Sequence, residues 1–139
     1  MTNHVHLLIN APDLVELARF SQMLQRRYAY YYCSRYGWVG NVFQRGYRSV
    51  VVDRDEYLLE CGRYIERNPI KAGLSSDPGS YPHSSFGYYS LGQPDPLLEP
   101  SPAYLGLADT ERDRMLSYWH YVSEERIQET ANLNNELPF

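Results

Sequence analysis

The sequence predicts an α+β fold, in which strands and amphipathic helices follow one another along the chain. An apolar run close to the first residue and a β-branched run at residues 49–52 are typical of strands. Elsewhere apolar residues recur at three- and four-residue steps, which is typical of helices that cover a sheet. At 139 residues, the chain has the length of one domain.

The first expected element is a buried strand in the run Met1–Ile9, which ends near Asn10 and carries two histidines. Because side chains alternate along a strand, His4 and His6 are expected to point to one side while Val5 points into a core. Their Cα atoms would lie about 6.6 Å apart, and two imidazoles at that spacing can bind one metal ion at about 2.1 Å each. Hydrogen-bonded structural histidines are the alternative, and the spacing alone fits both.

A helix is expected next, from about residue 13 to residue 34, with one apolar stripe and arginines beside it. Six arginines and no acidic residue lie between residues 17 and 52: Arg19, Arg26, Arg27, Arg35, Arg45 and Arg48. Tyrosines lie among them, and arginine with tyrosine is a combination that binds phosphates and stacks bases. The segment therefore predicts a nucleic-acid surface despite the net charge of −4, with a solvated basic face as the alternative.

A hairpin and a second helix follow this basic segment. Residues 42–43 and 47–52 are expected to form the two strands, around Arg45-Gly46. Asp53, with Glu56 three residues later, resembles a capping box and predicts a helix over residues 54–67. Asn68-Pro69 is expected to end it, because the residue before a proline disfavours helical geometry.

The last third of the chain has a different composition. Residues 75–102 are rich in Ser, Pro and Gly and are expected to form a long surface excursion. The aromatic anchors expected in it are Tyr81, Phe86, Tyr88 and Tyr89. A last helix is expected over residues 110–130, and residues 132–139 are expected to form a frayed tail.

The second helix carries a possible reactive pair. Tyr64 and Asn68 are four residues apart and lie one above the other on a helix face. If this helix crosses the histidine strand, the Asn68 oxygen could join His4 and His6 around a divalent metal, with Tyr64 placed to attack a phosphorus. A core tyrosine and a helix-capping asparagine are the alternative interpretations.

Several stretches, taken together, resemble the HUH single-strand transposases with one catalytic tyrosine, especially the group associated with repetitive extragenic palindromes. The resemblance covers about residues 1–90. The stretches that carry it are Met1-Thr2-Asn3-His4-Val5-His6-Leu7-Leu8-Ile9 and residues 40–49, 53–59, 63–74 and 81–86. The resemblance implies a DNA transposase that cuts and rejoins single-stranded DNA, next to a hairpin, through a covalent 5′-phosphotyrosine.

The resemblance also implies a role for each site residue. His4 and His6 would be the metal-binding pair, Asn68 the third ligand, and Mg²⁺ or Mn²⁺ the metal. Tyr64 would be the nucleophile, and Tyr57, two turns earlier on the same face, is the alternative. We expect the DNA backbone to be contacted by arginines of the basic segment: Arg26, Arg27, Arg45 and Arg48.

The expected architecture follows from the same resemblance. It is a ferredoxin-like antiparallel sheet with helices on one face, lacking its usual first strand, helix and strand, plus a C-terminal helix. Residues 1–90 would form the catalytic domain, and residues 91–139 a loop, the C-terminal helix and the tail. Exposed sheet edges would favour pairing with another chain, so a homodimer is possible. An inactive or domesticated hairpin-DNA-binding protein is the alternative function.

The composition also predicts where the protein acts. The sequence has no apolar run of 18 residues and no basic leader, so neither a membrane partner nor a signal peptide is expected. Cys33 and Cys61 are isolated and are expected to be reduced thiols. Together with the resemblance, these features predict a cytoplasmic, nucleoid-associated bacterial protein.

Overall fold

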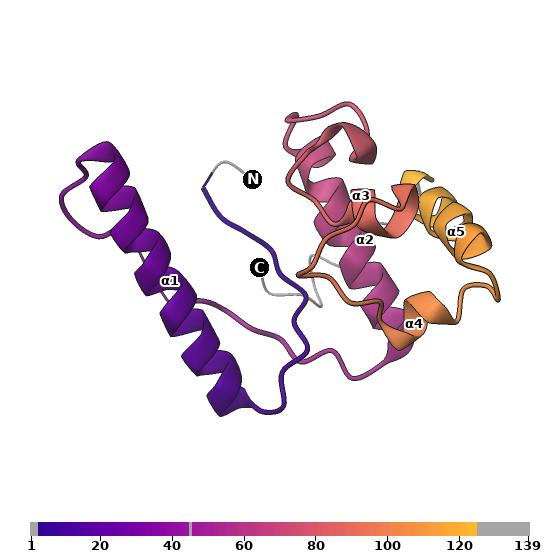
Figure 1. Ribbon diagram of the computed structural model, residues 1–139, viewed down its shortest axis with the longest axis horizontal. Helices are drawn as coiled ribbons and strands as arrows, with labels where there is room; N and C mark the ends of the chain where they lie inside the picture. Colours follow the sequence, from indigo (N-terminus) through magenta and orange to yellow (C-terminus); the bar gives the residue numbers. More distant parts are fainter. Residues whose placement is uncertain (1–2, 45, 125–139) are drawn as a thin grey trace. The chain divides into compact units, whose positions relative to one another are not determined.

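The computed structural model describes residues 3–44 and 46–124, and this part of the chain is helical (Figure 1). Its helices are α1 (Leu14–Tyr36), α2 (Asp55–Lys71), the 3-10 helix η1 (Pro78–Ser80), α3 (Phe86–Leu91), α4 (Pro102–Leu105) and α5 (Glu111–Ser123). The residues described contain no β-strand. The predicted ferredoxin-like antiparallel sheet is therefore wrong.

The absence of a sheet has a physical reason in the segments predicted as strands. A strand exists only where its backbone N–H and C=O groups pair with a neighbouring strand. No backbone hydrogen bond joins residues 3–10 to residues 46–53, and their apolar side chains stay in solvent: Val5 is 73% exposed and Val51 75%. Both segments have a composition that suits a sheet, but neither has a strand to pair with among the described residues.

The chain divides into two compact units. Of the described residues, the first unit contains 3–8 and 51–124, and therefore α2, η1, α3, α4 and α5. The second unit contains residues 9–44 and 46–50, and therefore α1. The candidate active-site residues belong to the first unit, and the arginines of the basic segment belong to the second.

Helix α1 forms as the sequence predicts. The Asp13 carboxylate accepts a hydrogen bond from the Glu16 backbone N–H at 2.8 Å, which satisfies one of the free donors of the first turn. Gly37 ends the helix in the left-handed conformation, with φ of 64°, a backbone geometry that glycine adopts without strain. The predicted helix is confirmed, and it ends two residues later than expected.

Helix α2 extends further than the sequence predicts. It passes through Pro69 and ends at Lys71, and the Ala72 N–H donates to the Asn68 carbonyl at 2.9 Å. The expected stop at Asn68-Pro69 is therefore wrong, since the surrounding turn holds the helical geometry. The predicted cap at Asp53 is also wrong, because Arg54 takes the N-cap position and forms no side-chain cap.

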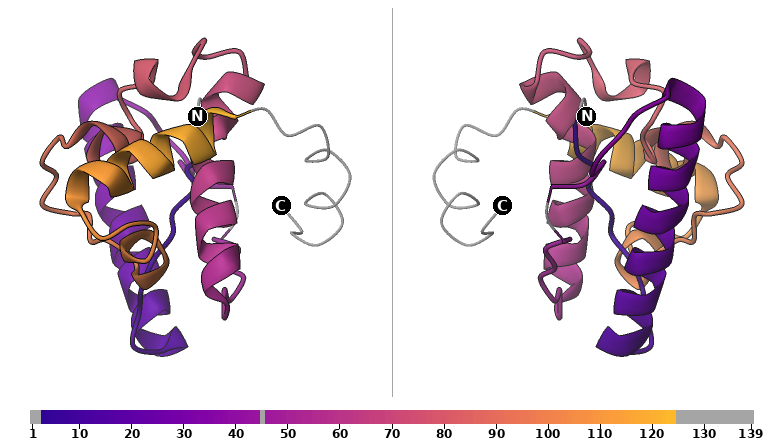
Figure 2. Two further views of the ribbon diagram at one scale, coloured as in Figure 1. Left: turned by 90° about the vertical axis from the view of Figure 1, so that its right-hand side faces the viewer. Right: turned by 90° about the vertical axis from the view of Figure 1, so that its left-hand side faces the viewer.

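The core of the first unit lies between its helices. Figure 2 shows α5 lying across α2, and α5 also packs against α3 and α4. The buried core side chains are Phe86, Tyr104, Tyr118 and Val122. Residues 75–102, expected as an irregular excursion, contain η1 and α3, and the expected anchor Phe86 is confirmed at 1% exposure. The predicted last helix is present as α5, but it ends at Ser123, before an extended Glu124, and not at residue 130 as expected. The expected tail, residues 132–139, lies outside the described residues.

Two arginines of α2 hold the end of α5. The Arg67 guanidinium donates to the Val122 carbonyl at 2.8 Å, and Arg63 donates to the carbonyl of Glu124. Cations are favourable at a helix C-terminus, where the last carbonyls lack helical partners. This contact fixes α2, and with it Tyr64, within the first unit.

Candidate active site

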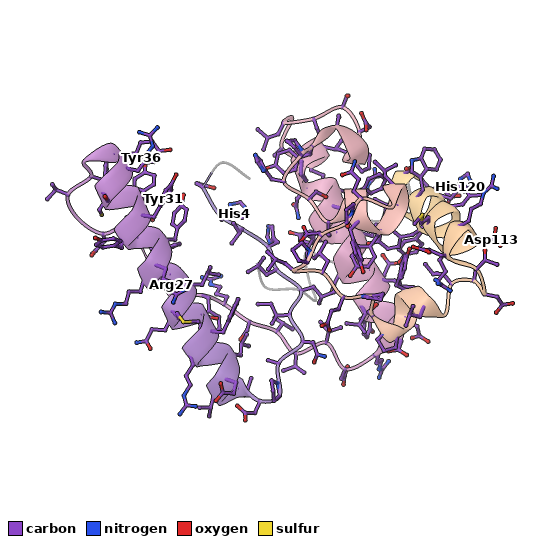
Figure 3. The ribbon with its side chains drawn as sticks, viewed as in Figure 1. His4, Arg27, Tyr31, Tyr36, Asp113 and His120 are labelled. Carbon is purple, nitrogen blue, oxygen red and sulfur yellow. The ribbon has the colours of Figure 1, made fainter. Side chains whose placement is uncertain are left out.

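The two histidines lie side by side in the extended segment that precedes α1. His4 is labelled in Figure 3. The Nε2 atoms of His4 and His6 are 3.1 Å apart, and the two rings are perpendicular with centroids 4.8 Å apart. The Nδ1 atom of His4 is 2.7 Å from the side-chain oxygen of Asn3. The predicted arrangement on one side of the backbone is therefore present, even though the segment is not part of a sheet.

The environment of His6 favours its neutral form. Partial burial lowers the pKa of His6 below its usual value, and the neighbouring charge of His4 lowers it further. Neutral imidazole nitrogens carry the lone pair that a metal ion needs. At neutral pH, the ring of His6 is therefore suited both to a hydrogen bond with His4 and to metal coordination.

Tyr64 lies against this histidine pair. Its ring centroid is 5.7 Å from that of His6, and the planes are close to perpendicular at 80°. Residue 64 is on α2, so the contact joins residues 58 positions apart in the sequence within one unit. The structure thus brings His4, His6 and Tyr64 together.

Asn68 lies one turn after Tyr64 and is 8% exposed. Its side-chain amide donates a hydrogen bond to the Tyr64 carbonyl at 2.9 Å, so the NH₂ group is turned toward the helix backbone. The amide oxygen remains as an acceptor. No hydrogen bond joins Asn68 to His4 or His6, so the structure brings Asn68 to Tyr64 and not to the imidazoles.

Tyr57 occupies a different environment. Tyr57 is 47% exposed, and the Arg54 guanidinium lies over its ring, with the Arg54 Cζ atom 5.7 Å from the ring centroid. Tyr57 makes no ring contact with His4 or His6. Of the two candidate nucleophiles, Tyr64 is the one that contacts a histidine.

A divalent metal at the histidine pair would need donor atoms beyond the two imidazoles. The described residues contain no group of three or more His, Cys, Asp or Glu side chains able to hold an ion. A site here would therefore use the two imidazoles, the Asn68 oxygen and water. Ligands at adjacent corners of an octahedron with about 2.1 Å bonds are about 3.0 Å apart, close to the 3.1 Å between the two Nε2 atoms.

Lys71 is a site residue that the sequence reasoning missed. Its ammonium lies 5.3 Å from the centroid of the Tyr64 ring, within the range of a cation–π contact. Partial burial lowers the pKa of Lys71, and the charges of Arg67 and Arg63 lower it further. The spacing of seven residues from Tyr64, two helical turns, is the signal that could have revealed it.

The predicted DNA-binding arginines lie in the second unit. Arg26 and Arg27 are exposed on α1, and Arg48 is exposed in the chain that follows it. Arg45 lies outside the described residues. The described arginines therefore have their charges in solvent, where phosphates can reach them.

With this geometry in place, the chain was compared with known proteins. Residues 1–68 match the family model described as Transposase IS200 like. The match to this IS200-like transposase family spans His4, His6 and Tyr64 and ends at Asn68. No curated protein and no solved structure matches the chain.

The IS200-like match supports the transposase family that the sequence motifs indicate. The match covers 68 of the chain's 139 residues, just under half. None of the helices in the described residues is long and apolar enough to span a membrane.

Proposed function

We propose that this protein is a single-tyrosine transposase that cuts and rejoins single-stranded DNA next to a hairpin, as in the group associated with repetitive extragenic palindromes. The observation that carries the proposal is the contact between the Tyr64 ring and His6, which itself lies 3.1 Å from His4. This contact supports the proposal because the proposed nucleophile lies next to the two side chains proposed to bind the metal, within the region that matches the transposase family.

The reaction begins at the phenol of Tyr64. Its oxygen attacks the phosphorus of a phosphodiester, the phenol proton is lost to solvent, and the bond from phosphorus to the 3′ oxygen breaks. The departing 3′ oxygen takes up a proton, which leaves a 5′-phosphotyrosine and a free 3′ hydroxyl. Attack by a second 3′ hydroxyl reverses these steps and joins the strands without ATP, because the new ester keeps the energy of the old bond.

His4, His6 and Asn68 are proposed to hold Mg²⁺ or Mn²⁺. The spacing of the two Nε2 atoms and the neutral form of His6 support this assignment. When bound, the metal would polarise a non-bridging oxygen of the phosphodiester. Asn68 must turn its amide oxygen toward the imidazoles, and its hydrogen bond to Tyr64 leaves that oxygen available as an acceptor.

A hairpin-DNA-binding protein that does not cut is the second candidate. It is favoured by one observation, namely that Asn68 contacts the backbone of its own helix rather than the histidines. A chain with two of three metal ligands in place would bind DNA through its arginines and leave it intact.

Covalent trapping tests the proposal. The full chain is incubated with a labelled oligonucleotide that carries a hairpin and a single-stranded flank, with Mn²⁺, and the products are separated under denaturing conditions. We expect a labelled protein adduct that is absent with EDTA, absent in Tyr64→Phe and reduced at least tenfold in His6→Ala, because each variant removes one part of the reaction.

Tyr57→Phe is the matched control for this experiment, because it removes the same hydroxyl from the same helix face. It should form the adduct at the wild-type level. An adduct that persists in Tyr64→Phe contradicts the assignment of the nucleophile. Binding of the oligonucleotide without any adduct in the wild type would favour the non-cutting candidate.

A further inference from the structure

One face of α1 forms a shallow hollow lined by Met23, Arg26, Arg27 and Tyr30. Its volume is about 420 Å³, and its lining comes from one helix. Met23 and Tyr30 are each three or four positions from both arginines, so the side chains lie next to one another on the helix surface. Arg27 is labelled on α1 in Figure 3.

Tyr30 differs from the other tyrosines of α1. Each of the others packs against a neighbouring ring, among them Tyr28 against Phe43 at 5.8 Å and Tyr32 against Tyr36 at 4.7 Å between centroids. Tyr30 makes no ring contact with a described residue and is 79% exposed. Its aromatic face is therefore open to a ligand, while its neighbours' faces are engaged in packing.

The two arginines beside Tyr30 are also available. Arg19, about two turns earlier on the helix, forms an ion pair with Glu16, with 2.5 Å between its guanidinium nitrogen and the carboxylate oxygen. Arg26 and Arg27 form no ion pair with any described residue, and residues 17–52 contain no acidic side chain that could provide one. An exposed ring between two uncompensated guanidinium groups attracts a ligand that is both flat and anionic.

We infer that this hollow binds an unpaired nucleotide of single-stranded DNA, with the base stacked on Tyr30 and the flanking phosphates bound by Arg26 and Arg27. Only an unstacked base exposes the face that the ring needs, so duplex DNA does not satisfy the site. The positive charge of the segment favours a polyanion such as DNA over an apolar protein surface or one with few acidic residues. The inference rests on the proposed function for its choice of DNA, and it adds a stacking site made of residues that take no part in the proposed chemistry.

Binding is measured by fluorescence with an oligothymidylate that carries one 2-aminopurine, whose emission falls when the base stacks. All proteins carry Tyr64→Phe, so that no cleavage intervenes. We expect the parent to quench the probe, Tyr30→Phe to bind as the parent does, and Tyr30→Leu to bind about tenfold more weakly with the quenching lost. Arg26→Gln with Arg27→Gln should weaken binding and reduce its salt dependence.

Trp119→Leu is the matched control, because it removes an exposed aromatic ring from α5 in the other unit. It should leave both affinity and quenching unchanged. Equal affinity and quenching in Tyr30→Leu and the parent would overturn the inference, as would equal binding of a duplex or tighter binding of an oligouridylate. Because adduct formation is not measured here, these results are independent of whether Tyr64 cuts DNA.

Discussion

At the scale of single residues, the most perturbed carboxyl of the described chain is Glu66. Its side chain is 1% exposed on α2, and the Ser85 hydroxyl donates a hydrogen bond to it at 2.6 Å. Burial raises the pKa of Glu66 to about 7, against the opposite effect of hydrogen bonds from Ser85 and Tyr118. Near neutral pH this carboxyl therefore carries a proton in part of the folded molecules.

The stability of the first unit should fall as pH rises toward 7. Folded Glu66 keeps a proton that the unfolded chain releases above its ordinary pKa of 4.5, so between 4.5 and about 7 the folded state binds more protons. This group alone would cost about 3 kcal/mol of unfolding free energy across that range. Glu66→Gln should remove the slope and raise stability at pH 8, as measured by denaturant unfolding at several pH values.

Glu99→Gln provides the comparison, because it makes the same substitution at an exposed glutamate. It should leave the pH dependence of unfolding as it is in the wild type. A wild-type slope that survives in Glu66→Gln would show that another group controls it.

At the scale of helices, the close approach of α2 and α5 depends on a glycine. A Cβ atom at Gly62 would lie 2.8 Å from the Tyr118 hydroxyl oxygen, closer than van der Waals contact allows. Tyr118 is 3% exposed and packs against Tyr89 and Tyr104, with centroids 5.3 and 5.5 Å away. Its ring therefore has little room to move aside.

Gly62→Ala should destabilise the protein, although alanine is the better helix former by about 1 kcal/mol. Displacing the buried Tyr118 ring should cost about 1–3 kcal/mol, as overpacking does in other cores. Thermal unfolding followed by circular dichroism would show a lower midpoint. Gly106→Ala is the control, since its added Cβ would meet its nearest neighbours at 3.5 Å, an ordinary contact, and its midpoint should stay close to wild type.

At the scale of the whole molecule, the charges are segregated along the sequence. Residues 9–50 contain six arginines and two acidic residues, whereas residues 51–139 contain seven basic and fifteen acidic residues. The net charge of −4 thus conceals a basic unit within an acidic chain. DNA binding by such a protein depends on the local charge, because screening confines electrostatic attraction to about 10 Å at ordinary salt.

Affinity for single-stranded DNA should therefore fall steeply with salt despite the acidic composition. Each phosphate contact contributes about −0.7 to the slope of log affinity against log salt, so Arg48→Gln should make the slope shallower by about that amount. Arg112→Gln removes the same charge from α5 in the acidic unit and should leave the slope unchanged. Equal slopes in the wild type and Arg48→Gln would exclude Arg48 from the DNA contact.

The fold was predictable where neighbouring residues in the chain control it. The start of α1 depends on the Asp13 side chain and its end on Gly37, so both could be located to within two residues. At Pro69 the same local reasoning failed, because the turns around it maintain the helix. The prediction of a sheet was wrong for a different reason. The β-branched residues at positions 49–52 favour a strand, but they do not determine which segment would pair with it.

The candidate site also has features that the local sequence determines and features that depend on tertiary packing. Residue spacing alone was enough to propose His4 and His6 as a pair and Tyr64 and Asn68 as a pair, because each spacing is a property of one local segment. That the Tyr64 ring meets His6 depends on how α2 packs against a segment about sixty residues away in the chain, whereas the Tyr57 ring contacts Arg54, three residues before it. Contacts of that kind arise from the packing of the whole unit, and no local spacing in the sequence determines them.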